Sequence, residues 1–168
     1  MLSNKLLLVT NDDGYFALGI KALVEELYKY TKNIIVLAPK NETSAVSHGI
    51  TLRTGLSLKE ELPIYKDVKT YSLDGTPADC VSVGITYLNI KPDYVISGIN
   101  NGLNMGDDIL YSGTCGACFE ASLLGYKAHL GAGAVTSNVK SDKTLVEVKV
   151  DVDVIKTGLK KFGAMLGD

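Results

Sequence analysis

Arginine and tryptophan are almost absent from this 168-residue chain, and basic residues as a whole are not in excess. Arg53 is the only arginine, and there is no tryptophan. The 17 basic and 19 acidic residues leave a formal net charge of −2. Proteins that bind nucleic-acid duplexes or anionic membranes are usually basic, so we expect neither as a partner. A site built from several arginine clamps is also excluded.

Cysteine is sparse, and long apolar runs are missing. Cys80, Cys115 and Cys118 form an odd set without framework spacing, which indicates a reducing compartment. No stretch reaches the roughly 18 apolar residues that a membrane span needs. The N-terminal MLSNKLLLVTNDDG has a short apolar run without a cleavage site, unlike a signal peptide. We therefore expect a soluble, cytoplasmic protein.

Short apolar runs alternate with helical patterns along the first hundred residues. Residues 6–10 and 34–38 are continuous apolar runs, typical of strands that are covered on both faces of a parallel sheet. Between them, residues 20–27 repeat apolar side chains at helical spacing. Strand, helix and strand in so short a stretch predict a βαβ unit. With further strands over 69–73 and 94–97, the pattern indicates an α/β fold with a mainly parallel sheet.

The second half of the chain carries two clear helical patterns, and the patterns after Tyr126 are weaker. Helices are predicted over 77–88, opened by Pro77, and over 114–125, ended by a glycine. After Tyr126, Gly131 and Gly133 interrupt the strand that should follow. Residues 145–150 alternate like a strand, and a last helix is predicted with Asp151 or Asp153 as its cap. Its apolar face is Ile155, Leu159, Phe162 and Leu166. No linker or repeat intervenes, so we expect a single domain over residues 1–168.

Polar clusters stand where three of the predicted strands end. Residues 11–14 (NDDG) follow the first strand, residues 41–47 follow the second, and residues 97–112 follow the strand that begins at Tyr94. In an open parallel sheet, ligands bind outside the carboxyl ends of the strands. The order of these segments therefore predicts a functional site at that edge.

Asp12 and Asp13 are adjacent carboxylates on one turn, and they repel each other unless a cation lies beside them. A pair of carboxylates at a helix N-terminus is the alternative interpretation, and the two stay open at this point. Ser44, Asn100 and Asn104 offer further, neutral oxygens. An all-oxygen set of ligands selects a hard cation such as Mg²⁺ or Mn²⁺ over zinc.

Ser112, Gly113 and Thr114 open a predicted helix, where backbone N–H groups and two hydroxyls make an anion site. An ordinary Ser/Thr helix cap is the alternative. A hard cation beside an anion site is the combination expected for phosphoryl chemistry.

Other catalytic motifs are absent or weak. There is no G-x-x-x-x-G-K-[ST], and Ser72 stands where the haloacid dehalogenase motif needs its nucleophilic Asp. Cys115 and Cys118, spaced C-x-x-C at a helix start, allow a redox or metal role, although small buried side chains are the simpler reading. His48, in a polar loop, is interpreted as solvated or at the edge of a substrate.

Four stretches of the chain together resemble the SurE family of survival proteins, which are metal-dependent 5′/3′-nucleotidases. They read LLLVTNDDGYFALGIKAL, VLAPKNETSAVSHGITL, LDGTPADCVSVGI and PDYVISGINNGLNMGDDILYSGTCGACFEASLLG, and they cover about residues 5–125. Family members continue well beyond residue 168. The chain thus resembles a shortened or diverged member, with residues 126–168 as a diverged tail.

The resemblance implies a Rossmann-like, three-layer α/β fold and a single divalent metal per chain. The implied metal ligands are Asp12, Asp13, Ser44 and Asn100. The implied phosphate and substrate side of the pocket is formed by Asn104, Gly106, Asp107, Ser112, Gly113 and Thr114. Family members assemble as homodimers or higher oligomers, so a homo-oligomer is expected.

The function favoured by the sequence is a 5′-nucleotidase, a metal-dependent phosphatase that hydrolyses nucleoside 5′- and 3′-monophosphates to nucleoside and phosphate. Asp12 and Asp13 are expected to be catalytic as well as metal-binding, because one of them positions or deprotonates the attacking water. A non-catalytic nucleotide- or phosphate-binding module is the competing interpretation. A redox protein using Cys115 and Cys118 is a third.

Overall fold

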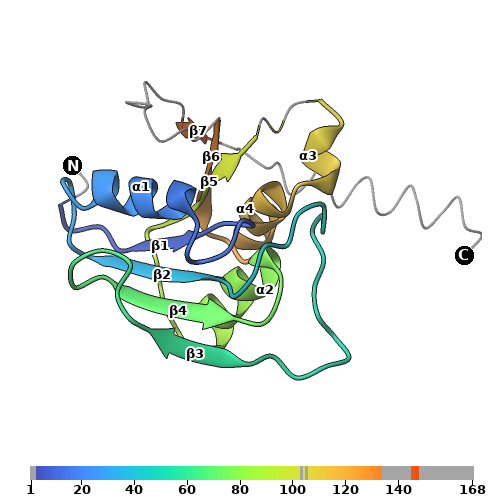
Figure 1. The fold of residues 1–168 in the computed structure, drawn as a ribbon, viewed down its shortest axis with the longest axis horizontal. Coiled ribbons are helices and arrows are strands. Elements are labelled where there is room, and N and C mark those ends of the chain that lie inside the picture. The colour runs from blue at the N-terminus through green and yellow to red at the C-terminus, as the bar shows by residue number, and fades with distance from the viewer. Residues whose placement is uncertain (1–2, 103, 105, 134–144, 148–168) are drawn as a thin grey trace, which may run out of the picture.

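The computed structural model describes residues 3–102, 104, 106–133 and 145–147, in which seven strands form one sheet (Figure 1). The order of the strands across the sheet is β3-β4-β2-β1-β5-β6-β7. Their bounds are β1 (Leu7–Thr10), β2 (Ile34–Pro39), β3 (Leu58–Glu61), β4 (Lys69–Leu73), β5 (Tyr94–Asn101), β6 (Lys127–Gly133) and β7 (Leu145–Glu147).

The five inner strands are parallel, and only the two edge strands, β3 and β7, run antiparallel to their neighbours. β1 lies in the middle, where Leu7 is in register with Ile34 of β2 and with Tyr94 of β5. Because these strands are parallel, the segments that follow β1, β2, β4 and β5 all emerge at the same edge of the sheet. This confirms the predicted α/β fold with a mainly parallel sheet.

Helices cover both faces of the sheet. The helical elements are α1 (Leu18–Leu27), α2 (Pro77–Ser82) with the π-helix η1 (Val83–Tyr87), α3 (Asp108–Tyr111) and α4 (Gly113–Leu123). Leu7 of β1 belongs to the core under α1, whereas Leu8 belongs to the core under α2 and α4. Successive side chains of a strand point to opposite faces, which explains why an unbroken apolar strand serves two cores. The arrangement has three layers and is Rossmann-like.

Several predicted elements differ in extent from those in the structure. Residues 58–61 carry no strand pattern but form β3, an edge strand whose sequence LKEE has no apolar alternation because its side chains are exposed or half-buried. The predicted helix over 77–88 is present as α2 followed by η1. The polar cluster over residues 97–112 contains regular structure, since β5 extends to Asn101 and α3 occupies residues 108–111.

The prediction that Gly131 and Gly133 interrupt the next strand is wrong, because both lie in β6. A Cβ atom on Gly98 of β5 would lie 2.2 Å from the carbonyl oxygen of Gly131. The two strands therefore approach each other closely beside a bulge between Ser97 and Asn100, and glycine permits that approach. Close backbone packing therefore accounts for Gly98, whereas a Cβ atom on Gly131 itself would lie 3.4 Å from Ile99 Cγ1, so Gly131 is compatible with a regular strand.

The C-terminal predictions are tested only in part. β7 covers Leu145–Glu147, the first half of the strand predicted over 145–150. The predicted last helix, with Asp151 or Asp153 as its cap, lies outside the described residues. Across the described ranges, none of the helices has the length and hydropathy required to traverse a bilayer.

Candidate metal and phosphate site

A tight turn at the end of β1 holds Asp12 and Asp13. The Asn11 side chain, fully buried, donates from Nδ2 to the carbonyl oxygen of Gly14 at 2.8 Å. Gly14 has φ of 95°, a conformation that favours glycine. Tyr15 N then donates to the carbonyl oxygen of Pro39, which fastens the turn to the end of β2. The turn thus fixes two adjacent carboxylates at the carboxyl edge of the sheet.

Asp12 is buried and bound by the N-terminus of helix α4. Thr114 donates from Oγ1 to Asp12 Oδ1 at 2.5 Å and from its backbone N to Oδ2 at 3.2 Å. Asp12 is 5% exposed and Thr114 is fully buried. A helix N-terminus stabilises a negative charge, so α4 compensates for the burial of this carboxylate.

Asp13 is half-buried and lies beside the end of β5. Asn101 N donates to Asp13 Oδ2 at 3.2 Å. Burial raises the pKa of the Asp13 carboxyl, the hydrogen bond from Asn101 lowers it in part, and the charges of Asp12 and Glu42 raise it further. The turn therefore carries negative charge that a bound cation would offset.

Ser44 is brought to this edge by the segment that follows β2. Thr43 donates from its backbone N to the carbonyl oxygen of Asp12 at 2.8 Å, and its hydroxyl makes a longer bond to the same oxygen. The Ser44 side chain itself is exposed, and its Oγ donates to Glu42 Oε1 at 2.8 Å. The backbone on one side of Ser44 is thus anchored to the Asp12 turn, while the hydroxyl is engaged by Glu42.

Asn100 and Asn104 lie together after the β5 bulge. Asn100 donates from Nδ2 to Asn104 Oδ1 in a long contact of 3.4 Å. Asn104 Nδ2 is buried without a hydrogen-bond partner among the described residues. Gly106 and Asp107 are exposed and lead into α3. The structure therefore brings Asn100 and Asn104 together and places Gly106 and Asp107 at the surface.

The helix opening at Ser112–Gly113–Thr114 already binds an anionic group of the protein. Ser112 is the N-cap of α4, and its Oγ accepts from Cys115 N at 3.1 Å. The hydroxyl and N–H of Thr114 both serve Asp12. A cap for Ser112 and a carboxylate partner for Thr114 are thus what the structure shows, and a phosphate contact here remains a proposal.

The oxygen ligands that the site offers suit a hard divalent cation. Asp12, Asp13, Ser44 and Asn100 supply oxygens only, and Mg²⁺ and Mn²⁺ prefer oxygen ligands. The amide nitrogen of Asn100 is occupied as a donor, which leaves its oxygen as the group to face a cation. In the part of the chain that the structure describes, no three His, Cys, Asp or Glu side chains converge as a metal site, so a zinc-type cluster is not found there.

The cysteines are buried, free thiols. Burial raises the pKa of Cys118 to about 12 and also raises the pKa of Cys115 and of Cys80. The reactive form of cysteine is the thiolate, which these surroundings disfavour. The redox interpretation of Cys115 and Cys118 is therefore not supported, and both thiols pack in the core below α4.

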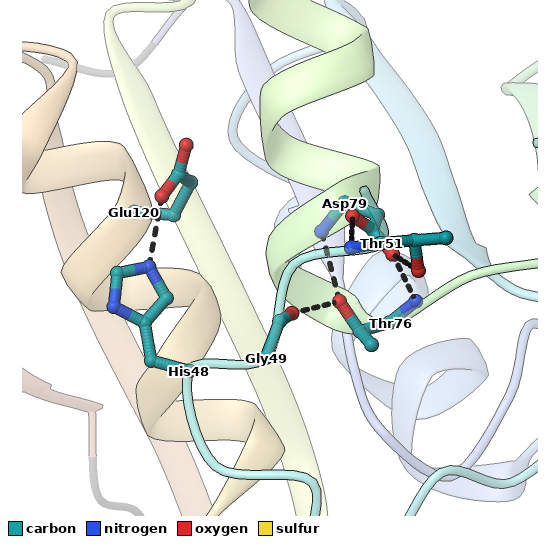
Figure 2. A network of polar contacts seen from close by, with 6 residues as sticks. All are labelled: His48, Gly49, Thr51, Thr76, Asp79 and Glu120. Atoms are coloured by element: carbon teal, nitrogen blue, oxygen red, sulfur yellow. Dashed lines mark hydrogen bonds and ion pairs between the residues drawn. The ribbon is translucent and has the colours of Figure 1, made fainter. Parts of the chain in front are cut away.

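Four residues near the site escaped the sequence analysis or were interpreted differently. Glu42 and Thr43 contact the metal-ligand candidates directly. His48, interpreted as solvated or at the edge of a substrate, is half-buried and donates from Nε2 to Glu120 Oε2 at 2.8 Å (Figure 2). The buried Asp79 accepts from Thr51 and Thr76, and its T-x-x-D spacing with Thr76 is a capping-box signal that the sequence offered.

Comparison with known proteins connects this chain to a family. The family model described as "Survival protein SurE" matches residues 7–162. A protein named 5′-nucleotidase SurE from Thermoanaerobacter pseudethanolicus is 43% identical over 157 residues, which cover 92% of this chain and 62% of the relative. The protein of the same name from Clostridium beijerinckii is 48% identical over 119 residues, or 71% of this chain and 47% of the relative.

A solved structure supports the same relationship. The crystal structure of the SurE protein from Aquifex aeolicus superposes with a TM-score of 0.68 at 39% identity, covering 92% of this chain and 60% of that one. The chain thus spans about half to three fifths of the length of the relatives it matches.

Proposed function

The chain belongs to the SurE family, and from that membership we propose that it is a metal-dependent phosphatase acting on nucleoside 5′- and 3′-monophosphates. The observation that carries the proposal is the Asp12–Asp13 turn, held by α4 at the carboxyl edge of a parallel sheet. Relatives of this chain bear the name 5′-nucleotidase, which supports the phosphomonoester as the substrate class.

In this proposal Asp12, Asp13, Ser44 and Asn100 hold one Mg²⁺ or Mn²⁺. Such a cation, when bound, polarises a phosphate oxygen and acidifies a water molecule. Asp12 has both oxygens engaged by Thr114, so we assign it to binding and orientation. Asp13, which is less buried and accepts one bond from Asn101, is the better placed to orient the attacking water and accept its proton.

The substrate is proposed to lie over the same edge of the sheet. Ser112, Gly113 and Thr114 stand next to Asp12, and Asn104, Gly106 and Asp107 lie on the segment between β5 and α4. A pocket of about 260 Å³ opens beside the turn and is lined by residues 40–43 and 73–75. Its position next to Thr43, which contacts Asp12, makes it the proposed place for the nucleoside.

The test is hydrolysis of a panel of nucleoside 5′- and 3′-monophosphates with Mn²⁺, with Mg²⁺ and with excess chelator. We expect phosphate release that requires the metal and falls at least about 100-fold in Asp12→Asn, because a charged ligand is lost. Asp67→Asn, which removes the same charge at an exposed position before β4, at the amino edge of the parallel strands, is the matched control and keeps full activity.

Two results would contradict the proposal. Hydrolysis that persists in Asp12→Asn with excess chelator excludes the metal mechanism. Tight binding of nucleoside monophosphate without any phosphate release identifies the non-catalytic binding module instead.

A further inference from the structure

The segment of residues 43–51, which carries Ser44, is fastened to helices α2 and α4 (Figure 2). On the α2 side, Thr51 donates to Asp79 from its backbone N at 2.9 Å and from Oγ1 at 2.6 Å. Thr76 Oγ1 donates to the carbonyl oxygen of Gly49 at 2.6 Å. Asp79 is also part of the capping box of α2, so this attachment belongs to the fold itself.

On the α4 side, the contacts lie along one face of the helix. Gly113, Gly116 and Glu120 are spaced i, i+3 and i+7, which places them in a single row. A Cβ atom on Gly113 would lie 3.0 Å from Val46 Cγ2, and one on Gly116 would lie 2.4 Å from the carbonyl oxygen of Ser47. Glu120 ends the row by accepting from His48. Residues 46–48 of the segment therefore pack directly on α4.

The same helix binds the other half of the proposed metal site. Thr114, at the start of α4, holds the Asp12 carboxylate. Ser44 lies between two fixed points of the segment, since Thr43 donates to the carbonyl oxygen of Asp12 and His48 contacts Glu120. One helix thus sets the position of Asp12 and of the segment that carries Ser44.

We propose that His48 and Glu120 are positioning residues, whose contact holds the 43–51 segment on α4 and thereby fixes Ser44 relative to Asp12. The inference rests on the proposed function. The side chains of His48 and Glu120 are 29% and 13% exposed, so the contact is shielded from water more than a surface ion pair. Neither residue is among the proposed ligands.

The test measures Mn²⁺ affinity by titration calorimetry on the full chain after treatment with chelator. His48→Ala and Glu120→Ala are each expected to weaken Mn²⁺ binding up to about tenfold, the lower end of the cost of losing a residue hydrogen-bonded to a ligand, because these two side chains contact the segment and not Ser44 itself. The double variant binds no more weakly than either single variant, because the two residues act through one contact. At saturating Mn²⁺, kcat stays within about twofold of the native value, since the ligands themselves are unchanged.

Two further variants separate positioning from general stability. Glu120→Gln recovers part of the affinity, because an amide oxygen still accepts from His48 Nε2. Lys5→Ala removes the 2.7 Å ion pair with Asp93 at the amino ends of β1 and β5, and it leaves Mn²⁺ affinity unchanged. If Glu120→Ala does not fold, His48→Ala carries the loss of the contact and Glu120→Gln its partial retention.

The outcomes are distinct. Native Mn²⁺ affinity in the folded His48 and Glu120 variants, or additive losses in the double variant, would overturn the positioning role while the metal site stands. Absence of Mn²⁺ binding by the native chain would overturn the proposed metal function, and the positioning role with it.

Discussion

Asp12 is a buried carboxylate whose two oxygens both accept from a single residue, Thr114. A buried charge of this kind is costly unless hydrogen bonds and a helix terminus compensate for the lost hydration. The backbone N–H of Thr114 is supplied by any residue at that position, whereas the hydroxyl is specific to the side chain. At the scale of single residues, the site therefore depends on one hydroxyl group.

Thr114→Val should lower the free energy of unfolding by about 1–3 kcal/mol, because it leaves Asp12 Oδ1 without its donor at nearly constant side-chain volume. Thr114→Ser retains the hydroxyl and is the control. Urea unfolding of the metal-free protein measures both variants. A loss in Thr114→Ser without a loss in Thr114→Val would mean that the methyl group of Thr114, and not its hydroxyl, is what the site requires.

Helix α4 combines several tasks in its 11 residues. Its first turn binds Asp12, its inner face supplies Cys118 and Ala117 to the core, and a third face supports the 43–51 segment. Small residues along GTCGAC allow this close packing on several sides. The helix is therefore the element that connects the Asp12 turn with the Ser44 segment.

Gly116→Ala should destabilise the protein by about 1–3 kcal/mol, although alanine is normally the better helix former. The added Cβ would lie 2.4 Å from the carbonyl oxygen of Ser47, so the segment or the helix must move. Gly55→Ala, where nothing lies within 4 Å of the added atom, should change stability by less than about 0.5 kcal/mol. Thermal and urea unfolding of both variants decide the comparison, and a stable Gly116→Ala would contradict the close packing.

The elements that could be predicted from the sequence are those with a strong local pattern. β1 and β2 have unbroken apolar runs because both faces of these strands are buried. α1 has a clear helical period because one side of the helix is buried against the sheet. β3 and β6 were not predicted, since an exposed edge strand and a glycine-lined strand depend on neighbours distant in the sequence.

The same reasoning explains what could be predicted of the site. The convergence of the Asp12 turn with the segments after β2 and β5 follows from parallel topology alone. The contacts of Thr43 with Asp12 and of Asn101 with Asp13 show this convergence. The partners of each group were not predictable, because Thr114 and Glu120 meet theirs over separations of 102 and 72 residues. Pairings of that kind are fixed by packing, which leaves no local signal.

At the scale of the whole molecule, Asp93 and Asp13 lie in opposite electrostatic surroundings. Asp93 accepts from Lys5 and from Leu6 N, and these contacts lower the pKa of its carboxyl. Asp13 lies near Asp12 and Glu42, and burial with these charges raises the pKa of its carboxyl. Ionised Asp93 therefore stabilises the folded chain, and ionised Asp13 opposes folding.

Asp13→Asn should therefore raise the stability of the metal-free protein at pH 7 and remove its stabilisation by Mn²⁺. Because the pKa of folded Asp13 lies above the ordinary 3.8, its ionisation costs stability as the pH rises from 3.8 through the folded value. Asp93→Asn is the control of opposite sign: the pKa of folded Asp93 lies below 3.8, so its contribution is present at pH 7 and is lost as the pH falls through the folded value. Urea unfolding at pH 7, with and without Mn²⁺ at about 100 times its Kd, measures both effects. Mn²⁺ should add about 2.7 kcal/mol to the free energy of unfolding of the native protein and of Asp93→Asn, and no comparable amount to that of Asp13→Asn. A less stable metal-free Asp13→Asn would show that the turn needs this charge to fold, and an undiminished gain from Mn²⁺ would exclude Asp13 as a ligand.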